Sequence, residues 1–383
     1  MLPYADEHHA FRRTVRRFVE REIAPHHAAW ERDGQVPRAL WRRAGELGLL
    51  CTGIGSDYGG AAGPDGGDFL FAAIVVEELS FAGATGPLFQ LHSDIVAPYI
   101  DHYGSAEQKA RWLPPMARGE TISAICMTEP GAGSDLAALR TTARRDGDDY
   151  VIDGQKIFIS NGQIADLFVV AAKTDPAAGA SGVSLLLVEA DRAGFGRGRR
   201  LEKLGLHAQD TSELFFDGVR VPASNLLGEP GRGFKYLMQQ LPQERLLVAI
   251  AAVAASEAAL AWTVEHVEQR QAFGAPLASL QTVRHALAEV KTEIAVGRAF
   301  LDQCTIKHRQ RQLDNAEASM AKWWLTEMQF RVIDRCLQLF GGYGYMREFP
   351  IARAWADARV QRIYGGTTEI MKEIVSRAMF RGR

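Results

Sequence analysis

The sequence is poor in cysteine. Its four cysteines, at positions 51, 126, 304 and 336, show no CxxC pair and no other paired spacing. This pattern argues against a metal site and against a disulfide framework. It also predicts a reducing compartment, the cytoplasm.

The chain also lacks an excess of charge of one sign, a secretory leader and a long apolar run. Its 44 lysines and arginines nearly balance its 46 aspartates and glutamates, so the charge gives no reason to expect nucleic acid as a partner. The N-terminal sequence MLPYADEHHA contains no apolar segment of the kind found in signal peptides. The longest apolar run, 246–255, is too short to cross a bilayer and predicts a buried helix, so we expect no membrane span.

What remains is typical of an ordinary globular protein. Of its 383 residues, 47% are hydrophobic and 23% are charged, and this length suffices for two or three domains. Apolar spacing is helical in residues 1–120, changes to strand-like alternation in 121–230 and is helical again in 231–383. We therefore predict an α+β fold with an α-helical, a β and a second α-helical domain.

In the first domain we expect an N-terminal helix and further helices at 37–47, 67–80 and 92–103. The N-terminal helix has an apolar stripe and an opposite face rich in arginine. Those residues are Phe11, Val15, Phe18 and Ile23 on the stripe, and Arg12, Arg13, Arg16 and Arg17 opposite. The arginines could contact a membrane surface, but the narrow stripe favours a helix face that contacts solvent.

In the second domain, strands are expected at 121–127, 167–172 and 183–189. Two Asp-Gly pairs, 153–154 and 217–218, stand between short apolar segments and predict two hairpin turns. In the third domain, residues 283–301 mark one apolar face of a long helix and 316–340 form another. Long helices with short connections predict a four-helix bundle.

Two glycine clusters lie in the last part of the chain, Gly341-Gly342-Tyr343-Gly344 and Gly365-Gly366, each after an apolar helix end. Glycine permits positive φ and close approach of the backbone to a ligand. A further glycine-rich motif, Cys-Met-Thr-Glu-Pro-Gly-Ala-Gly-Ser-Asp-Leu-Ala-Ala, occupies 126–138. This motif, and the spacing of Gln338, the first glycine cluster, Arg353 and Asp357, resemble the two signatures of the acyl-CoA dehydrogenase family.

The resemblance covers essentially the whole chain and carries several implications. It implies an N-terminal α-helical domain, a middle β-barrel domain and a C-terminal four-helix bundle. It also implies FAD as cofactor and a reaction that converts an acyl-CoA thioester to the trans-2-enoyl-CoA. In that reaction a base removes the α-proton, the β-hydride passes to the flavin N5, and donors stabilise the thioester oxygen.

The position of the base distinguishes branches of the family. Most members carry a glutamate where this chain has Gly365. A minority branch, which includes the long-chain and isovaleryl-CoA dehydrogenases, carries the base in a Glu-Arg pair on a helix, as in Glu244-Arg245 here. We therefore predict Glu244 as the base, with a burial-raised pKa, and the long-chain branch as the nearest resemblance. The alternatives are that Glu244 only caps a helix or that Glu369 is the base.

The resemblance also assigns the substrate contacts. Gly365 would contribute its backbone N–H to the thioester oxygen, Tyr364 would line the reaction site, and Ser134 would lie beside the acyl-CoA. Arg245 would face the coenzyme A portion. Because it is 100° around the helix from Glu244, we expect it not to share the glutamate's pocket. An exposed surface arginine is the alternative.

The flavin contacts form two groups. Contacts to the ring within the same chain would come from the β-domain, and the start of the last helix would close over the flavin. These residues are Met127, Thr128, Ser134, Phe158, Ser160, Thr367 and Glu369. A second group resembles the segments that reach the FAD of a neighbouring subunit: Arg270, Phe273, Gln281, Gln338, Gly341 and Gly342. A site shared in this way implies at least a dimer, and the family norm is a homotetramer built as a dimer of dimers.

Several functional alternatives stay open at this stage. The substrate carrier could be coenzyme A or an acyl carrier protein, and chain length is not fixed. The expected electron acceptor is an electron-transferring flavoprotein, although oxygen is the acceptor in related oxidases. A flavin monooxygenase or a non-catalytic binding protein could also use this fold.

Overall fold

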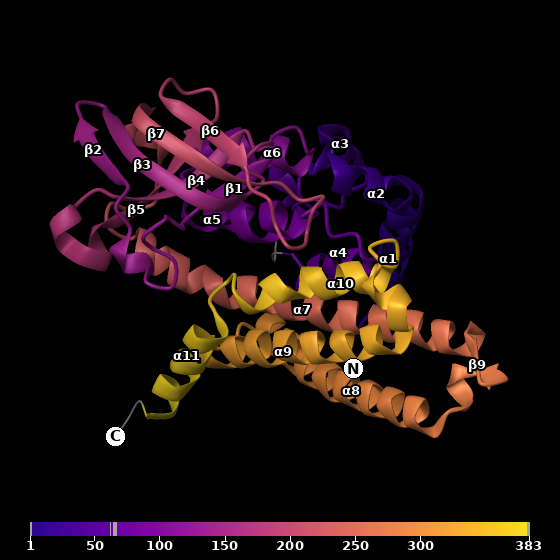
Figure 1. Cartoon of the computed structure of the whole chain (residues 1–383). Helices are drawn as coiled ribbons and strands as arrows, with labels where there is room; N and C mark the ends of the chain where they lie inside the picture. The colour runs from indigo at the N-terminus through magenta and orange to yellow at the C-terminus, as the bar shows by residue number, and fades with distance from the viewer. Residues whose placement is uncertain (1, 62, 64–66, 381–383) are drawn as a thin grey trace.

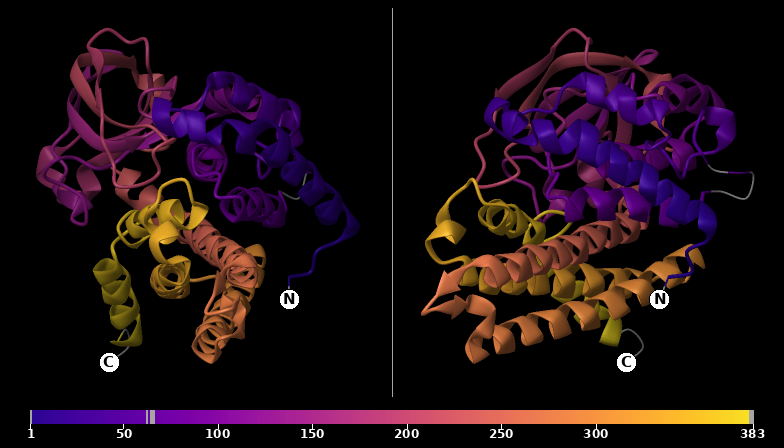
Figure 2. Two further views of the ribbon diagram at one scale, coloured as in Figure 1. Left: turned by 45° about the vertical axis from the view of Figure 1, so that its right-hand side comes forward. Right: turned by 90° about the vertical axis from the view of Figure 1, so that its right-hand side faces the viewer.

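The protein consists of a helical region, a β-sheet region and a second helical region in chain order (Figure 1). The computed structural model describes residues 2–61, 63 and 67–380. Figure 2 shows the N-terminal helices and the sheet side by side above the C-terminal helices. The predicted order of α, β and α is therefore confirmed.

The first region contains six α-helices, counted over the described residues. They are α1 (Asp6–Phe18), α2 (Ala24–Asp33), α3 (Arg38–Glu46), α4 (Phe69–Phe81), α5 (Ala97–Tyr103) and α6 (Ala106–Ala117). The helices predicted at 37–47 and 67–80 correspond to α3 and α4.

The arginine-rich face of α1 only partly contacts solvent. Arg12 donates to both Glu77 and Glu78 of α4, with N···O distances of 2.7 and 2.9 Å, and Arg16 donates to Glu78 at 2.8 Å. Arg298, from the C-terminal region, binds Glu77 as well. The expectation of a solvated face is therefore wrong for Arg12, which is largely withdrawn from solvent by its pairing with the buried carboxylates of α4. It holds for Arg16, which stays exposed while it binds Glu78.

The helix predicted at 92–103 begins as a π-helix, Leu91–Val96, before it continues as α5. Pro98 lies at the junction and has no N–H to donate to the carbonyl of Asp94. The side chain of Gln243 donates to that carbonyl instead, at 2.7 Å. This bond ties the π-helix to the long helix that carries Glu244.

The second region is a curved eight-stranded sheet. Its strands are β1 (Ser123–Cys126), β2 (Thr142–Asp146), β3 (Asp149–Ser160), β4 (Leu167–Lys173), β5 (Val183–Glu189), β6 (Phe195–Arg200), β7 (Thr211–Pro222) and β8 (Leu226–Leu227). The strand order is β6-β7-β3-β2-β4-β5-β8, and β1 pairs with β4. The strands expected at 121–127, 167–172 and 183–189 are β1, β4 and β5.

Both predicted Asp-Gly hairpin turns are wrong, because each pair lies inside one continuous strand, β3 or β7. The two pairs face each other across these strands, where the register shifts between Ile152 and Gly154. The N–H of Gly218 donates to the carboxylate of Asp153 at 2.8 Å, so the four residues form a bulge rather than a turn. The actual turn lies at Gly147 (φ +60°), between β2 and β3.

The third region is built on three long helices, α7 (Gly233–Gln269), α8 (Gln281–Arg309) and α9 (Asn315–Phe340). The shorter α10 (Pro350–Ala358) and α11 (Thr368–Phe380) pack against α9. A small hairpin, β9 (Gln271–Ala272) with β10 (Ala275–Pro276), joins α7 to α8. In Figure 1 this hairpin and α11 lie at opposite ends of the bundle.

Helix α7 is the central element, since it packs against α4, α8 and α9. By length and composition alone it could cross a membrane, but 61% of its most apolar 18-residue window is buried inside the protein. The expected absence of a membrane span stays a prediction. All four cysteines are buried and unpaired.

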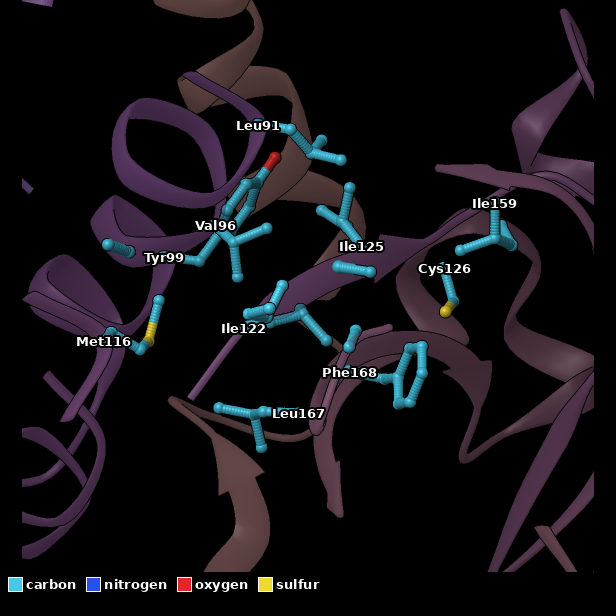
Figure 3. Close-up of a cluster of buried hydrophobic side chains, with 14 of the residues drawn as sticks. Leu91, Val96, Tyr99, Met116, Ile122, Ile125, Cys126, Ile159, Leu167 and Phe168 are labelled. Atoms are coloured by element: carbon cyan, nitrogen blue, oxygen red, sulfur yellow. The ribbon is translucent and has the colours of Figure 1, made fainter. Parts of the chain in front are cut away.

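The N-terminal helices and the sheet share one apolar core (Figure 3). Val96, Tyr99 and Met116 of the helices meet Ile122 and Leu167 of the β region there. Tyr99 is fully buried in this core, so its ring position is fixed by packing.

Candidate active site

The carboxylate of Glu244 lies on α7 in the interior of the protein. Glu244 is only 6% exposed. One of its carboxylate oxygens accepts a hydrogen bond from the Tyr99 hydroxyl at 2.8 Å. Glu244 stands well inside α7, which begins at Gly233 and passes through Pro242 without ending. The interpretation of Glu244 as a helix cap is therefore wrong.

Burial raises the pKa of Glu244 from its ordinary value to about 7. Loss of water around the carboxylate is the main cause, and the Tyr99 hydrogen bond and the charge of Arg245 oppose it. A carboxylate with a pKa near neutrality is half ionised near pH 7 and can both accept and release a proton. This is the behaviour required of a general base.

Arg245 is buried and holds the backbone of Gly365 by a hydrogen bond. Its guanidinium donates to the side chains of Asn315 and Ser319 on α9, and its Nε donates to the Gly365 carbonyl at 3.3 Å. It is 3% exposed, so the alternative of a surface arginine is wrong. Arg245 and Glu244 also line the same cavity, contrary to our expectation, and the long arginine side chain extends to Gly365, another residue of the lining.

The glycine pair Gly365-Gly366 forms the wall that Arg245 contacts. Both residues have positive φ, +64° and +98°, which side-chain-bearing residues rarely adopt. Among the described residues, nothing accepts a hydrogen bond from the Gly365 N–H. Tyr364 and Gly365 line the same cavity as Glu244, so this amide is a free donor in the residue set that contains the base.

The β-domain supplies the opposite wall of the cavity, with residues from both predicted segments. Met127, Thr128, Ser134, Phe158 and Ser160 all line it. Phe158 is 64% exposed and has a φ of +60°, so its ring is not part of the apolar core.

A buried ion pair holds the Met127–Thr128 segment in place. Lys156 donates to the carboxylate of Glu129 at 2.8 Å and to the carbonyl of Met127 at 3.1 Å. The carbonyl of Thr128 accepts from the Ile157 N–H at 3.0 Å. The wall is thus fixed by β3, the strand that also carries Phe158 and Ser160.

These walls enclose a cavity of about 530 Å³, a size usual for a cofactor or ligand site. The exposed aromatic ring of Phe158 suits the flat face of a flavin. The hydroxyls of Thr128 and Ser160 and the free backbone N–H of Gly365 suit polar groups at its edge. The residues present therefore fit FAD. A larger cavity of about 1170 Å³ lies by Asp94 and His308, and none of the predicted site residues lines it.

The second group of predicted residues lies elsewhere, at the far end of α7. Arg270, Phe273, Gln281, Gln338, Gly341 and Gly342 are all exposed. The Arg270 guanidinium lies 5.5 Å from the ring centre of Tyr343, which follows Gly342. At 1.5 Å per residue, Arg270 is about 40 Å along α7 from Glu244, so the two groups cannot contact one small molecule within a single chain.

Comparison with known proteins identifies the family. Models of the acyl-CoA dehydrogenase N-terminal, middle and C-terminal domains match residues 5–120, 124–219 and 231–380. The chain belongs to the acyl-CoA dehydrogenase family.

Individual relatives agree over nearly the full length. The long-chain specific acyl-CoA dehydrogenase of Sus scrofa mitochondria is 54% identical over 98% of this chain and 86% of its own. A crystal structure of an acyl-CoA dehydrogenase from Geobacillus kaustophilus is 51% identical and superposes with a TM-score of 0.96, covering 99% of this chain and all of that one. A chain in a structure titled for the electron transferring flavoprotein of Acidaminococcus fermentans is 33% identical, with a TM-score of 0.94 over 99% of each chain.

These relationships establish the type of reaction. This acyl-CoA dehydrogenase is an FAD-dependent oxidoreductase that introduces a double bond between the α- and β-carbons of an acyl-CoA. The flavin monooxygenase and the acyl-carrier-protein alternatives are not favoured.

Thr367 and Glu369 lie next to the site rather than in it. They stand at the start of α11, and neither lines the cavity, whereas Ile370 and Glu373 do. Glu369 is exposed, and this solvent contact makes it a poor rival to Glu244 as the base. Their predicted role in seating the flavin stays a prediction.

Sequence reasoning missed two buried residues of this acyl-CoA dehydrogenase. Tyr99 gives no sequence signal, because it looks like any other apolar position of its helix. Lys322 does give one, since it is a charged residue in the apolar stretch 318–325, the same signal that marked Glu244. Its ammonium donates to the Gly366 carbonyl at 2.7 Å.

Substitution of Glu244 by glutamine tests the assignment of the base. We expect kcat to fall by roughly 10²–10⁴-fold, because the amide cannot accept the α-proton. Flavin content and acyl-CoA affinity should stay close to those of the wild type, because shape and burial are retained. Anaerobic flavin reduction in a stopped-flow instrument measures the proton-abstraction step directly.

The matched control for this experiment is Glu265→Gln, an exposed glutamate on the same helix, which should behave as the wild type. If Glu244→Gln retains full activity, or if Glu369→Gln alone abolishes reduction, Glu244 is not the base.

The raised pKa of Glu244 predicts a pH dependence. The base works only when ionised, and its pKa is about 7, so kcat/KM should fall about tenfold per pH unit below pH 7. Above that pH it should level off. A profile that stays flat down to pH 5 would contradict a base with this pKa.

Proposed function

We propose that this enzyme uses Glu244 to remove the α-proton of a long-chain acyl-CoA and that it acts as a homotetramer. The observation that carries the proposal is that a buried carboxylate, Glu244, and a residue with a free backbone amide, Gly365, line the same cavity. A carbon acid next to a thioester needs both groups, a base for the proton and a donor for the oxygen.

The residues of the chain perform distinct tasks in this mechanism. The ionised Glu244 accepts the α-proton, and Tyr99 holds its carboxylate in place. The N–H of Gly365 donates to the thioester oxygen as negative charge develops there. When bound, FAD supplies the acceptor for the β-hydride, and Met127, Thr128, Phe158 and Ser160 would hold its ring.

The preference for a long, apolar acyl chain rests on the lining of the cavity and on the relatives. Apolar residues of the π-helix and of α7 line the cavity together with Glu244: Leu91, Ile95, Met238, Leu241 and Val248. The named long-chain relatives are more than half identical to this chain. The same names support coenzyme A as the carrier.

Assembly as a dimer of dimers is supported by the exposed group at the far end of α7. Phe273 is 95% exposed, which is unusual for an aromatic side chain unless another molecule covers it. A guanidinium such as that of Arg270 pairs well with phosphate oxygens. We propose that this group completes the FAD site of a neighbouring subunit.

The electron acceptor and the compartment complete the proposal. An electron-transferring flavoprotein is the proposed acceptor, in keeping with the family and with the similar chain in the structure of the A. fermentans electron transferring flavoprotein. The cytoplasm is the proposed location, in keeping with four unpaired cysteines.

Anaerobic mixing of the flavin-loaded enzyme with saturated acyl-CoAs tests the proposed substrate. The panel runs from short to long chains and includes branched ones. We expect long chains to bleach the visible flavin band fastest and to produce a long-wavelength charge-transfer band, because they fill the apolar lining. Bleaching by short or branched chains alone would refute the long-chain proposal, and no bleaching by any thioester would refute the function.

Substitution of Arg270 by alanine tests the shared site. We expect the ratio of flavin to protein to fall severalfold or the tetramer to dissociate, as followed by absorbance and by sedimentation. Arg13→Ala, at an exposed position of α1, is the control and should change neither quantity. Unchanged flavin content together with unchanged assembly in Arg270→Ala would count against the shared site.

A further inference from the structure

Two buried cations hold consecutive carbonyls of the glycine pair. Arg245, on α7, donates to the carbonyl of Gly365, and Lys322, on α9, donates to the carbonyl of Gly366. The two bonds come from different helices and meet at one short segment between Arg362 and α11. The glycine pair is therefore tied to the rigid part of the bundle at two neighbouring points.

These ties matter because the glycines cannot fix their own backbone. Gly365 and Gly366 have no side chains to pack, and glycine loses more conformational freedom on ordering than any other residue. Space is also open around Gly365, where an added Cβ would meet nothing within 4 Å. The direction of the Gly365 N–H must therefore be set by bonds from outside the pair.

Lys322 occupies an unfavourable place for a charged side chain. It is 0% exposed and lies among buried residues of α9 such as Ala321 and Leu325. Its pKa is lowered to about 7, chiefly by burial and also by the nearby charge of Arg245, while Glu327 and Glu369 oppose the shift. The hydrogen bond of its ammonium to Gly366 is its main compensation.

Lys322 does not line the cavity, so it acts on the substrate only through the glycine pair. We propose that Lys322 is a positioning residue that holds the Gly366 carbonyl and thereby aims the Gly365 N–H at the thioester oxygen. The proposal rests on the role of Gly365 given above.

The experiment measures the stability of the bound enolate, which depends on the aim of this amide. The probe is a 3-thia-acyl-CoA, a thioester whose α-proton is acidified and whose enolate gives a long-wavelength absorption band beside oxidised flavin. The pH at half-formation of this band gives an apparent pKa for the enolate. That value reports on donors to the thioester oxygen and does not require turnover.

Two variants separate the hydrogen bond from the charge. Lys322→Met keeps most of the length and the apolar stem of the side chain but cannot donate, and we expect it to raise the apparent enolate pKa by about one unit and to lower kcat roughly 10–100-fold. The affinity for saturated acyl-CoA should change less than about threefold. Lys322→Gln retains a neutral N–H donor, one bond shorter than the lysine, and should recover part of the loss.

Thr326→Val is the matched control. Thr326 is equally buried on α9, but its hydroxyl donates to the carbonyl of Trp323 within the same helix, so its loss should leave the enolate pKa unchanged. A wild-type enolate pKa in Lys322→Met, with loss only of flavin content or thermal stability, would overturn the proposal. So would equal shifts in the Met and Gln variants, because the hydrogen bond would then play no part.

The wild-type enzyme and Glu244→Gln are measured in parallel, which distinguishes failure of this proposal from failure of the proposed function. If the wild-type enzyme itself forms no enolate band, the assigned function fails and the role of Lys322 fails with it. If the wild type forms the band and Glu244→Gln does not, the proposed function stands and the Lys322 variants alone decide the positioning role.

Discussion

The active site depends on one unfavourable interaction, the burial of the Glu244 carboxylate on an apolar helix. Within the described part of the chain, only Tyr99 gives this carboxylate a hydrogen bond, and Arg245 next to it donates elsewhere. A fully solvated carboxylate would have an ordinary pKa and would be a weak base at neutral pH. The fold maintains the burial by packing α7 against α4, α8 and α9, so the chemistry requires the whole bundle to be assembled.

Because the site lies where the three regions meet, each region contributes one necessary part. Tyr99 comes from the N-terminal helices, Phe158 and Ser160 from the sheet, and Gly365 from the C-terminal region. The hydrogen bond from Gln243 to the Asp94 carbonyl is one of the contacts that fix the N-terminal helices against α7. It gives a donor to a carbonyl to which Pro98 cannot donate, and it ties the π-helix to α7 at Gln243, the residue before the base.

The sequence predicted the motifs well and the contacts between distant segments poorly. The sequence alone linked Glu244 with Gly365. A glycine stands where most family members have the catalytic glutamate, and a glutamate stands on the helix where the minority branch has it. The Asp-Gly pairs misled us, since the same dipeptide serves a turn or a bulge, and only the strand opposite decides which one forms. Tyr99 could not be found, because its partner is 145 residues away. The sequence wrongly predicted that Arg245 does not share the pocket of Glu244. The angle between two residues around a helix gives the directions of their Cβ atoms, not how far a long side chain extends.

The glycine at position 365 is linked to the place of the base in this chain. A Cβ at Gly365 would meet no neighbouring atom, so space does not exclude a side chain there. The backbone only disfavours one, because a φ of +64° costs an ordinary residue roughly 1–2 kcal/mol. This cost is no exclusion, since most members of the family carry a glutamate at this position. In this chain glycine avoids the strain, the carbonyls of the glycine pair accept from Arg245 and Lys322, and the carboxylate comes from α7 instead.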